Sequence, residues 1–210
     1  MLILASASPR RRELLAQAGL RFTVEVAEID ETPLPHEPAA AYVQRIAIEK
    51  AQKVCALHVK DASQEPVVVL AADTAVVLPG DVILGKPTDQ ADAIRMLGLL
   101  SGRTHAVLTG IAAVSIEPGG KLGNKIHSDV EITQVTFNLM KLSEIEAYVT
   151  TGEPMDKAGA YAIQGYAARW IPRIDGDYFN VVGLPIARVV ALLAEVGQAS
   201  RAGVPVNATK

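Results

Sequence analysis

The chain has 210 residues, of which half are hydrophobic and only 4% are aromatic, so one large domain can form a core mainly of Ala, Val, Leu and Ile. The net charge of −3 excludes a generally basic, nucleic-acid-binding surface, and no apolar stretch approaches the roughly 20 residues that span a bilayer. One cysteine, Cys55, rules out an internal disulfide, and no signal-peptide pattern precedes Arg10. We therefore expect a cytoplasmic protein without nucleic-acid or membrane partners.

The first half of the chain alternates between strand and helix patterns. Residues 2–5 form a short apolar run that predicts a buried strand, and Ser8-Pro9 is typical of the N-cap and first residue of a helix. Residues 22–26 alternate weakly and predict a second strand, whereas apolar residues recur at helical spacing over 39–59. A run of six apolar residues then predicts a buried central strand that extends over 67–78.

The next elements are a helix and a long hairpin. Thr88 or Asp89 is a suitable N-cap for a helix that runs for about ten residues. Alternating stretches over 104–117 and 121–137 predict an antiparallel pair of strands, joined by a glycine-rich turn at 118–120.

The last part of the chain consists of shorter elements. Ser143–Glu146 has the pattern of a capping box that opens a short helix. A glycine-rich loop follows over 152–165, and apolar runs over 167–174 and 178–182 predict two strands. Pro185 begins a final helix that ends near residue 196.

Because strands and helices intermix, the class is α/β or α+β, and we expect an α/β fold built on a mixed, twisted sheet with helices on both sides. The long hairpin at about 104–137 could carry a second lobe, with a cleft between the two lobes. We expect a single domain over residues 1–196 and a C-terminal tail over 197–210.

The sequence SASPRRR at residues 6–12 places polar groups directly after the first predicted strand. Backbone N–H groups at a helix start favour anions, Ser8 adds a hydroxyl, and Arg10 and Arg11 add planar charged groups suited to phosphate. An ordinary N-cap beside a solvated basic face explains the same residues.

Two further stretches likewise allow both a functional and an ordinary structural interpretation. Glu31, in an acidic, proline-rich loop, is either solvated or a ligand of a divalent cation, provided that it faces the same cleft as the arginines. Lys50 lies in the apolar register of the predicted helix over 39–59, where it either snorkels to solvent or reaches a phosphate.

Asp73 follows six apolar residues on the predicted central strand. A carboxylate there needs a partner, which makes it a candidate general base or metal ligand, with a structural hydrogen-bonding role as the alternative. Lys86, in LGKP, offers a further positive charge for a phosphate oxygen. Gln164, in DKAGAYAIQG, offers both a donor and an acceptor for a base edge.

These candidates together indicate chemistry on the phosphates of a nucleotide. The arginines and lysines suit the phosphates, the carboxylates suit a metal ion, and the Gln164 amide suits a base. No Walker A or dinucleotide-binding glycine pattern competes with this interpretation, and the four histidines lack ligand spacing.

Eight stretches resemble, in the same order, the motifs of the Maf family, also called septum-formation-inhibitor proteins. They are LASASPRRRELL, EIDET, EKA, AADT, GKP, SGRTHAVLTG, DKAGAYAIQG and YFNVVGLP. The resemblance implies a two-lobed α/β fold similar to the inosine-triphosphate pyrophosphatases. It also implies a homodimeric nucleoside triphosphate pyrophosphatase that cleaves between the α and β phosphates with Mg²⁺ or Mn²⁺ as cofactor.

Three positions divide the family by substrate. One branch has Arg, Thr and Gln there and favours dTTP and UTP, including modified pyrimidines, while the other has Trp, Gln and Glu and favours 7-methyl-GTP. The corresponding residues are Arg10, Thr74 and Gln164, which match the first branch. A 7-methyl-GTP pyrophosphatase and a non-hydrolysing, nucleotide-binding regulator of cell division remain as alternatives.

The residues and the resemblance together assign a role to each candidate. Asp73 is the catalytic base, and Glu31 and Asp73 place the divalent cation. The substrate-binding and specificity residues are Ser8, Arg10, Arg11, Lys50, Thr74, Lys86 and Gln164, of which Thr74 and Gln164 are expected to read the pyrimidine.

Overall fold

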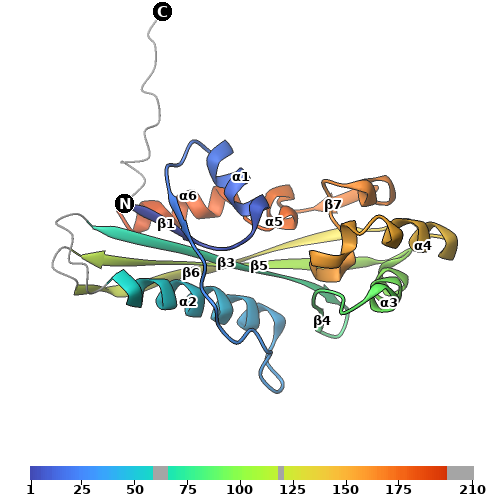
Figure 1. Cartoon of the computed structure of the whole chain (residues 1–210), viewed down its shortest axis with the longest axis horizontal. Helices are drawn as coiled ribbons and strands as arrows, with labels where there is room; N and C mark the ends of the chain where they lie inside the picture. Colours follow the sequence, from blue (N-terminus) through green and yellow to red (C-terminus); the bar gives the residue numbers. More distant parts are fainter. Residues whose placement is uncertain (59–65, 118–120, 198–210) are drawn as a thin grey trace, which may run out of the picture.

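The computed structural model describes residues 1–58, 66–117 and 121–197, which form a seven-stranded mixed sheet with helices against both faces (Figure 1). The strands are β1 (Leu2–Ala5), β2 (Thr23–Glu25), β3 (Val67–Leu78), β4 (Val82–Leu84), β5 (Thr104–Glu117), β6 (Lys121–Thr136) and β7 (Arg173–Asp175). The α-helices are α1 (Pro9–Gln17), α2 (Ala39–His58), α3 (Gln90–Leu100), α4 (Leu142–Thr150), α5 (Tyr178–Val182) and α6 (Ile186–Glu195). Three 3-10 helices lie between α4 and β7: η1 (Glu153–Asp156), η2 (Ala158–Ala160) and η3 (Tyr166–Trp170). None of the helices in these described ranges is long and apolar enough to cross a membrane.

The mixed sheet predicted from the sequence is confirmed. The strand order is β2-β1-β3-β5-β6-β7, and β4 pairs with β3 outside this path. β1 is parallel to both β2 and β3, since a helix separates each of these strands from the next along the chain, whereas β3, β5, β6 and β7 pair antiparallel. The turn predicted at 118–120 and all of the predicted tail except Gly197 lie outside the described residues.

Side chains alternate along β3 into two apolar layers, one on each face of the sheet. Val69 packs in a cluster with Ala47 of α2, and Leu70 packs in another with Leu15 of α1 and Val189 of α6. Figure 1 shows the same arrangement, with α2 on one face and α1, α5 and α6 on the other. Helices cover both faces, which explains why the first half of β3 is continuously apolar.

A third apolar cluster lies toward the other end of the long strands. It contains Val76 of β3, Val107 of β5 and Val135 of β6, together with Tyr148 of α4 and Trp170 of η3. The sheet is continuous between this cluster and the layers around α1 and α2, because β3 and β5 stay paired along most of their length. The division of the domain into two lobes stays a prediction.

Of the two strands predicted over 167–174 and 178–182, the second is wrong and the first is confirmed only at its end, in the short strand β7. The first segment is mainly 3-10 helix η3 followed by the short strand β7, and the second is the helix α5. Asp177 is the N-cap of α5, and its Oδ1 accepts a hydrogen bond from the backbone N–H of Phe179 at 2.7 Å. A short apolar run is compatible with either a strand or a buried helix, and here the cap favours the helix.

The capping box predicted at Ser143–Glu146 is also wrong in its position. Helix α4 begins at Leu142, and the Glu144 carboxylate accepts a hydrogen bond from the backbone N–H of Lys141 at 2.8 Å. The N-cap is therefore a lysine, a residue without the hydroxyl that the sequence pattern requires. For helix α3, by contrast, Asp89 is the N-cap, which resolves the two alternatives for its start.

Gly110 of β5 allows α2 to approach the sheet closely. A Cβ at this position would lie 2.2 Å from the carbonyl oxygen of Val43 and 2.7 Å from the backbone nitrogen of Gln44, both in α2. Since these are backbone atoms, no rotation of a side chain can relieve the overlap. The close approach holds α2 against the sheet about two turns before Lys50.

We expect Gly110→Ala to lower the free energy of unfolding by about 1–3 kcal/mol, because the added methyl group forces α2 away from β5. Urea unfolding followed by circular dichroism measures the change. Gly98→Ala is the matched control, because Gly98 lies inside α3 and an added Cβ meets no atom within 4 Å. The control should preserve or raise stability, since Ala favours a helix by about 1 kcal/mol over Gly. Equal unfolding curves for the two variants would contradict the expectation.

Candidate active site

The candidate site lies where one edge of β3 lacks a neighbouring strand. β1 pairs with β3 only as far as Leu70, and β4 begins its pairing at Val76, so within the described residues this edge is open over 71–75. Asp73 and Thr74 lie in the gap, and successive strand side chains point to opposite faces, so Asp73 faces α2 and Thr74 faces α1. A cavity of about 530 Å³ surrounds this gap.

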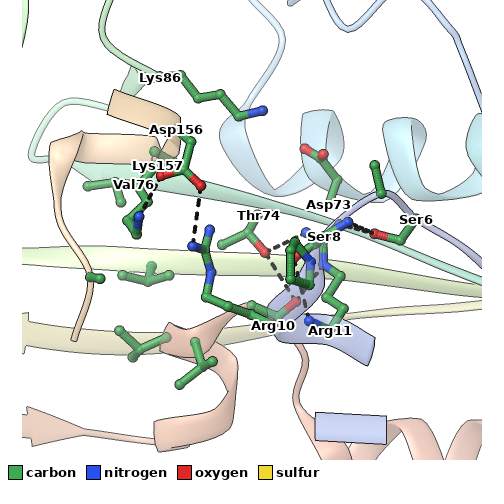
Figure 2. Close-up of a pocket in the computed structure, with 18 of the residues that line it drawn as sticks. Ser6, Ser8, Arg10, Arg11, Asp73, Thr74, Val76, Lys86, Asp156 and Lys157 are labelled. Carbon is green, nitrogen blue, oxygen red and sulfur yellow. Dashed lines mark hydrogen bonds and ion pairs between the residues drawn. The ribbon is translucent and has the colours of Figure 1, made fainter. Parts of the chain in front are cut away.

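The cavity brings together all nine residues that the sequence singled out as site candidates. They are Ser8, Arg10, Arg11, Glu31, Lys50, Asp73, Thr74, Lys86 and Gln164. Figure 2 shows several of these side chains converging from α1, from β3 and from the opposite wall. The acidic loop and the arginines do face the same cavity, as the metal hypothesis requires, while the role of each residue stays a prediction.

The N-terminus of α1 faces the cavity. Ser8 is its N-cap, with Oγ accepting a hydrogen bond from the backbone N–H of Arg11 at 3.4 Å, and Pro9 is its first residue, as predicted. Ser6 Oγ accepts in turn from the backbone N–H of Ser8 at 3.2 Å. Ser8, Pro9 and Arg10 all line the cavity, so the partial positive charge of the helix start favours an anion there.

The Arg11 guanidinium lies beneath this helix start and binds three other parts of the chain. Nε donates to the carbonyl oxygen of Gly183 at 2.8 Å, Nη1 to that of Ala72 at 2.8 Å, and Nη2 to Thr74 Oγ1 at 3.0 Å. Desolvation lowers the pKa of Arg11, and the Asp73 carboxylate opposes this shift. Most of the Arg11 donors are thus directed to the protein itself, and its predicted contact with phosphate stays a prediction.

Thr74 continues this network into the sheet. Its Oγ1 lies 3.0 Å from Thr109 Oγ1, and Thr109 Oγ1 donates to the carbonyl oxygen of Asn180 at 3.2 Å. Since the Thr109 proton is used in that bond, Thr74 accepts from Arg11 and directs its own proton either to Thr109 or to the carbonyl oxygen of Gly183, 3.5 Å away. The Thr74 hydroxyl can therefore only accept a hydrogen bond from a ligand. Its predicted role in reading the base is thus limited to contact with a donor group of that base.

Lys50 lies in the apolar register of α2, as the sequence indicated, and is only 8% exposed. Its Nζ is 2.8 Å from Asp73 Oδ1 and 2.8 Å from Glu31 Oε1. The ammonium therefore ends between two carboxylates, one from the central strand and one from the acidic loop. A charge removed from water needs such partners, and the arrangement holds Asp73 in place.

Glu31 and Asp73 converge closely enough to share one cation, which in this structure is the ammonium of Lys50. Within the part of the chain that the structure describes, no three His, Cys, Asp or Glu side chains gather into a complete metal site. Mg²⁺ commonly takes one or two protein carboxylates and fills its other positions with water and substrate phosphate oxygens. The pair fits a divalent cation of that kind, bound together with a phosphate ligand.

The opposite wall carries further charges. Arg10 Nη1 lies 3.6 Å from Asp156 Oδ2, and Asp156 Oδ1 accepts from Lys157 Nζ at 2.5 Å. Figure 2 shows Lys86 extending from the same wall. Burial raises the pKa of Asp156, but Lys157 and Arg10 lower it by more, so the carboxylate stays charged. Asp156 and Lys157 belong to the same candidate stretch as Gln164, DKAGAYAIQG, but the sequence indicated a role for neither of them.

Comparison with known proteins identifies the family. The family model described as Maf-like protein matches residues 1–196. The chain belongs to the Maf-like protein family. A Moorella thermoacetica protein named dTTP/UTP pyrophosphatase is 54% identical to it, over 93% of this chain and 95% of the relative. Proteins of the same name from Symbiobacterium thermophilum and Geobacter sulfurreducens are 49% and 48% identical, over 93% of this chain and 94% and 96% of their own lengths.

A solved structure, the nucleoside-triphosphatase or dITP/XTP pyrophosphatase of Mycobacterium abscessus, aligns with 97% of this Maf-like chain and 97% of its own. The sequence identity is 14% and the TM-score is 0.43, which is too low to support any inference. The α/β fold with a mixed sheet rests on the strand pairing of this chain itself.

Tyr42 is a residue of this Maf-like site that the sequence did not reveal. It lines the cavity, and its hydroxyl donates to the carbonyl oxygen of Glu31 at 3.0 Å. Burial, together with the charges of Asp73 and Glu31, raises the pKa of Tyr42 to about 12, so the phenol stays neutral. Tyr42 occupies an apolar position of α2, and a tyrosine in such a pattern indicates core packing, not a site.

The inner wall of the cavity contains Tyr161, which is held by His105 of the motif SGRTHAVLTG. Tyr161 Oη lies 2.9 Å from His105 Nε2, and the two rings pack edge to face. His105 is 1% exposed, and its Nδ1 has no hydrogen-bond partner within the described residues. Burial lowers the pKa of His105 to about 4, so the ring is neutral in the folded protein at neutral pH.

This buried histidine predicts an acid-sensitive part of the folding free energy. The unfolded chain protonates His105 near pH 6.5 and the folded chain only near pH 4. The free energy of unfolding therefore falls by up to about 3 kcal/mol as the pH is lowered through this window. We expect His105→Gln to remove that component, so that the stability difference from wild type shrinks between pH 7 and pH 4. Urea unfolding at each pH measures it. The control His36→Asn changes an exposed histidine and should parallel the wild type. Parallel curves for His105→Gln would contradict the expectation.

Proposed function

We propose that this protein is a nucleoside triphosphate pyrophosphatase that hydrolyses dTTP and UTP, and modified pyrimidine nucleotides, to the monophosphate and pyrophosphate. The observation that carries the proposal is a single cavity containing the paired Asp73 carboxylate and the anion-favouring start of α1. Cleavage of a phosphoanhydride needs positive charge for the phosphates and a group that activates water. The relatives named dTTP/UTP pyrophosphatase, about half identical to this chain, support the same activity.

The triphosphate would bind between the start of α1 and the opposite wall. Ser8 and the backbone N–H of Arg10 contribute from one side, since Pro9 has no N–H and that of Arg11 donates to Ser8 Oγ. Lys86 contributes its ammonium from the other side. Arg10 is available as well, because its partner Asp156 is 3.6 Å away and 68% exposed. An exposed ion pair of this kind is weak, so a phosphate can replace the carboxylate. Arg11 supports the helix start from beneath.

Asp73 is the proposed catalytic base. One of its carboxylate oxygens takes a proton from the attacking water, while the other, which accepts from Lys50 in this structure, stays with the ammonium or the proposed cation. As the water oxygen bonds to phosphorus, the bond from that phosphorus to the bridging α–β oxygen breaks and the two products separate. Arg10 and Lys86 stabilise the negative charge that develops on the phosphate oxygens.

Mg²⁺ or Mn²⁺ is the proposed cofactor. Glu31 and Asp73 would hold it together with substrate oxygens, and when bound it would supply Lewis-acid stabilisation of the phosphate charge. Lys50 keeps these two carboxylates side by side in its absence. A homodimer located in the cytoplasm is part of the proposal, supported by the resemblance to the family and by the composition of the chain.

Gln164 is the proposed reader of the pyrimidine edge. Its side chain is exposed and lines the cavity, so both its amide donor and its carbonyl acceptor can face a base. Thr74 contributes through its contact with Arg11, and Arg10 lies on the same cavity wall as the start of α1. The three positions have the residues of the dTTP and UTP branch.

The activity is tested by pyrophosphate release from purified protein with Mg²⁺ or Mn²⁺. The substrates are dTTP, UTP, 5-methyl-UTP, CTP, GTP and 7-methyl-GTP. We expect kcat/KM for dTTP and UTP to exceed that for 7-methyl-GTP by about 10- to 100-fold, because Gln164 pairs with the pyrimidine edge. A preference for 7-methyl-GTP would overturn the specificity assignment. Binding without any release would instead indicate a nucleotide-binding regulator.

We expect Asp73→Asn to lower kcat by about 10²- to 10⁴-fold, because the amide cannot accept a proton from water. Lys50 retains Glu31 as a partner, so the variant should stay folded and bind nucleotide. Asp92→Asn is the matched control, since Asp92 lies on α3 and is not among the residues that line the cavity. Near-normal turnover by Asp73→Asn, with the melting temperature preserved, would show that another group activates the water.

A further inference from the structure

The loop between α4 and β7 supplies one wall of the cavity. Residues 156–158 and 161–164 line it, and among them is Gln164, the base reader of the proposed function on which this inference rests. The loop contains only the short 3-10 helices η1, η2 and η3. Such short elements have few backbone hydrogen bonds of their own, so side chains hold the loop in place together with backbone contacts such as that from the N–H of Gly159 to the carbonyl oxygen of Gly85.

Glu153 and Tyr148 provide that connection. Tyr148, a fully buried residue of α4, donates its hydroxyl proton to Glu153 Oε1 at 2.7 Å and accepts from the backbone N–H of Ala162 at 3.3 Å. The backbone N–H of Tyr166 donates to Glu153 Oε1 at 3.1 Å and to Oε2 at 3.2 Å. We call these contacts the Glu153 clasp. Together they connect the loop at residues 153, 162 and 166.

Gly165 leaves the space that the clasp needs. A Cβ at this position would lie 2.2 Å from Glu153 Oε1 and 2.5 Å from Glu153 Cδ. The Gly165 φ of −104° is an ordinary value for any residue, so its backbone conformation does not require glycine. The carboxylate of Glu153 is therefore what excludes a side chain at residue 165.

Gln164 lies between the two backbone positions that the clasp holds, Ala162 and Tyr166. Its amide is exposed in the cavity, so the backbone on either side determines where it stands. We propose that Glu153 and Tyr148 are positioning residues for base recognition, because the Glu153 clasp fixes the backbone that presents Gln164 to the base.

A purely structural role would have a different signature. Tyr148, Tyr166 and Trp170 pack against one another, so disturbing this group would lower thermal stability without changing substrate selection. Positioning of Gln164 affects contacts that the substrate makes both in the ground state and in the transition state. Its loss therefore raises KM and leaves kcat nearly unchanged.

The first test uses the full-length protein and steady-state pyrophosphate release. We expect Glu153→Ala to raise KM for dTTP by about 10- to 100-fold, as is typical when a binding group is misplaced, and to reduce the preference for dTTP over 7-methyl-GTP. Glu153→Gln is the conservative variant. Its amide oxygen can replace Oε1, which accepts from both Tyr148 and Tyr166, so most of the affinity and selectivity should return.

A double-mutant cycle with Gly165 tests the clasp from the other side. Gly165→Ala places a methyl group where the carboxylate lies, so it should raise KM as Glu153→Ala does. In the Glu153→Ala background the same methyl group has space, and Gly165→Ala should add little. Val149→Ala is the stability control. It removes buried methyl groups next to Tyr148, and it should lower the melting temperature with KM and selectivity preserved.

Calorimetric binding of α,β-methylene dTTP provides the same test without turnover, because the dissociation constant should change as KM does. If the wild-type protein binds this analogue but releases no pyrophosphate from dTTP, the proposed function is wrong. The dissociation constants of wild type and Glu153→Ala for the analogue would still decide whether the clasp positions Gln164. Unchanged KM and dissociation constants in Glu153→Ala, with only a lower melting temperature, would overturn the positioning role. A wild-type protein that does not bind the analogue would overturn both proposals.

Discussion

The hydrogen bonds of Arg11 connect parts of the chain that lie far apart in sequence, and the arrangement of the site depends on them. Arg11 is 61 residues from Ala72 and 172 residues from Gly183, yet its guanidinium donates to the carbonyl oxygens of both. A partly buried guanidinium keeps such acceptors, because donors that lose both water and their partners are destabilising. Meeting this requirement places the start of α1 beside the open edge of β3. The anion-favouring helix end and Asp73 thereby come to face one cavity.

The open edge of β3 is a second constraint, because unpaired strand edges are normally covered or shortened. Here the opening is limited to the few residues between Leu70 and Val76, where pairing changes from β1 to β4. β1 is a parallel strand that leads directly into α1, and ligands in open α/β sheets bind outside the carboxyl ends of such strands. The brevity of β1 relative to β3 therefore creates the space that Asp73 and Thr74 line.

Features with a local cause could be predicted from the sequence. The apolar run of β3, the helical spacing of α2 and the Ser8 cap each depend on neighbouring residues, and each is confirmed. Residues 166–182 could not be predicted in this way, because short apolar runs fit several structures and distant packing decides among them. The unusual position of Lys50 in an apolar register indicated a buried charge. Its two partners, however, lie on other elements and left no local pattern.

Arg10 and Arg11 show why the identities of the site residues could be predicted and their contacts could not. The two side chains are the same and adjacent, and the sequence assigned both to phosphate. Each step along a helix turns the side chain by about 100°, so one arginine points under α1 and the other across the cavity. Arg11 meets the carbonyl of Gly183, whereas the one ion pair of Arg10 with the described residues is to the exposed carboxylate of Asp156. Of the two, Arg10 is therefore the one whose guanidinium a phosphate can reach without breaking the connections between α1, β3 and Gly183.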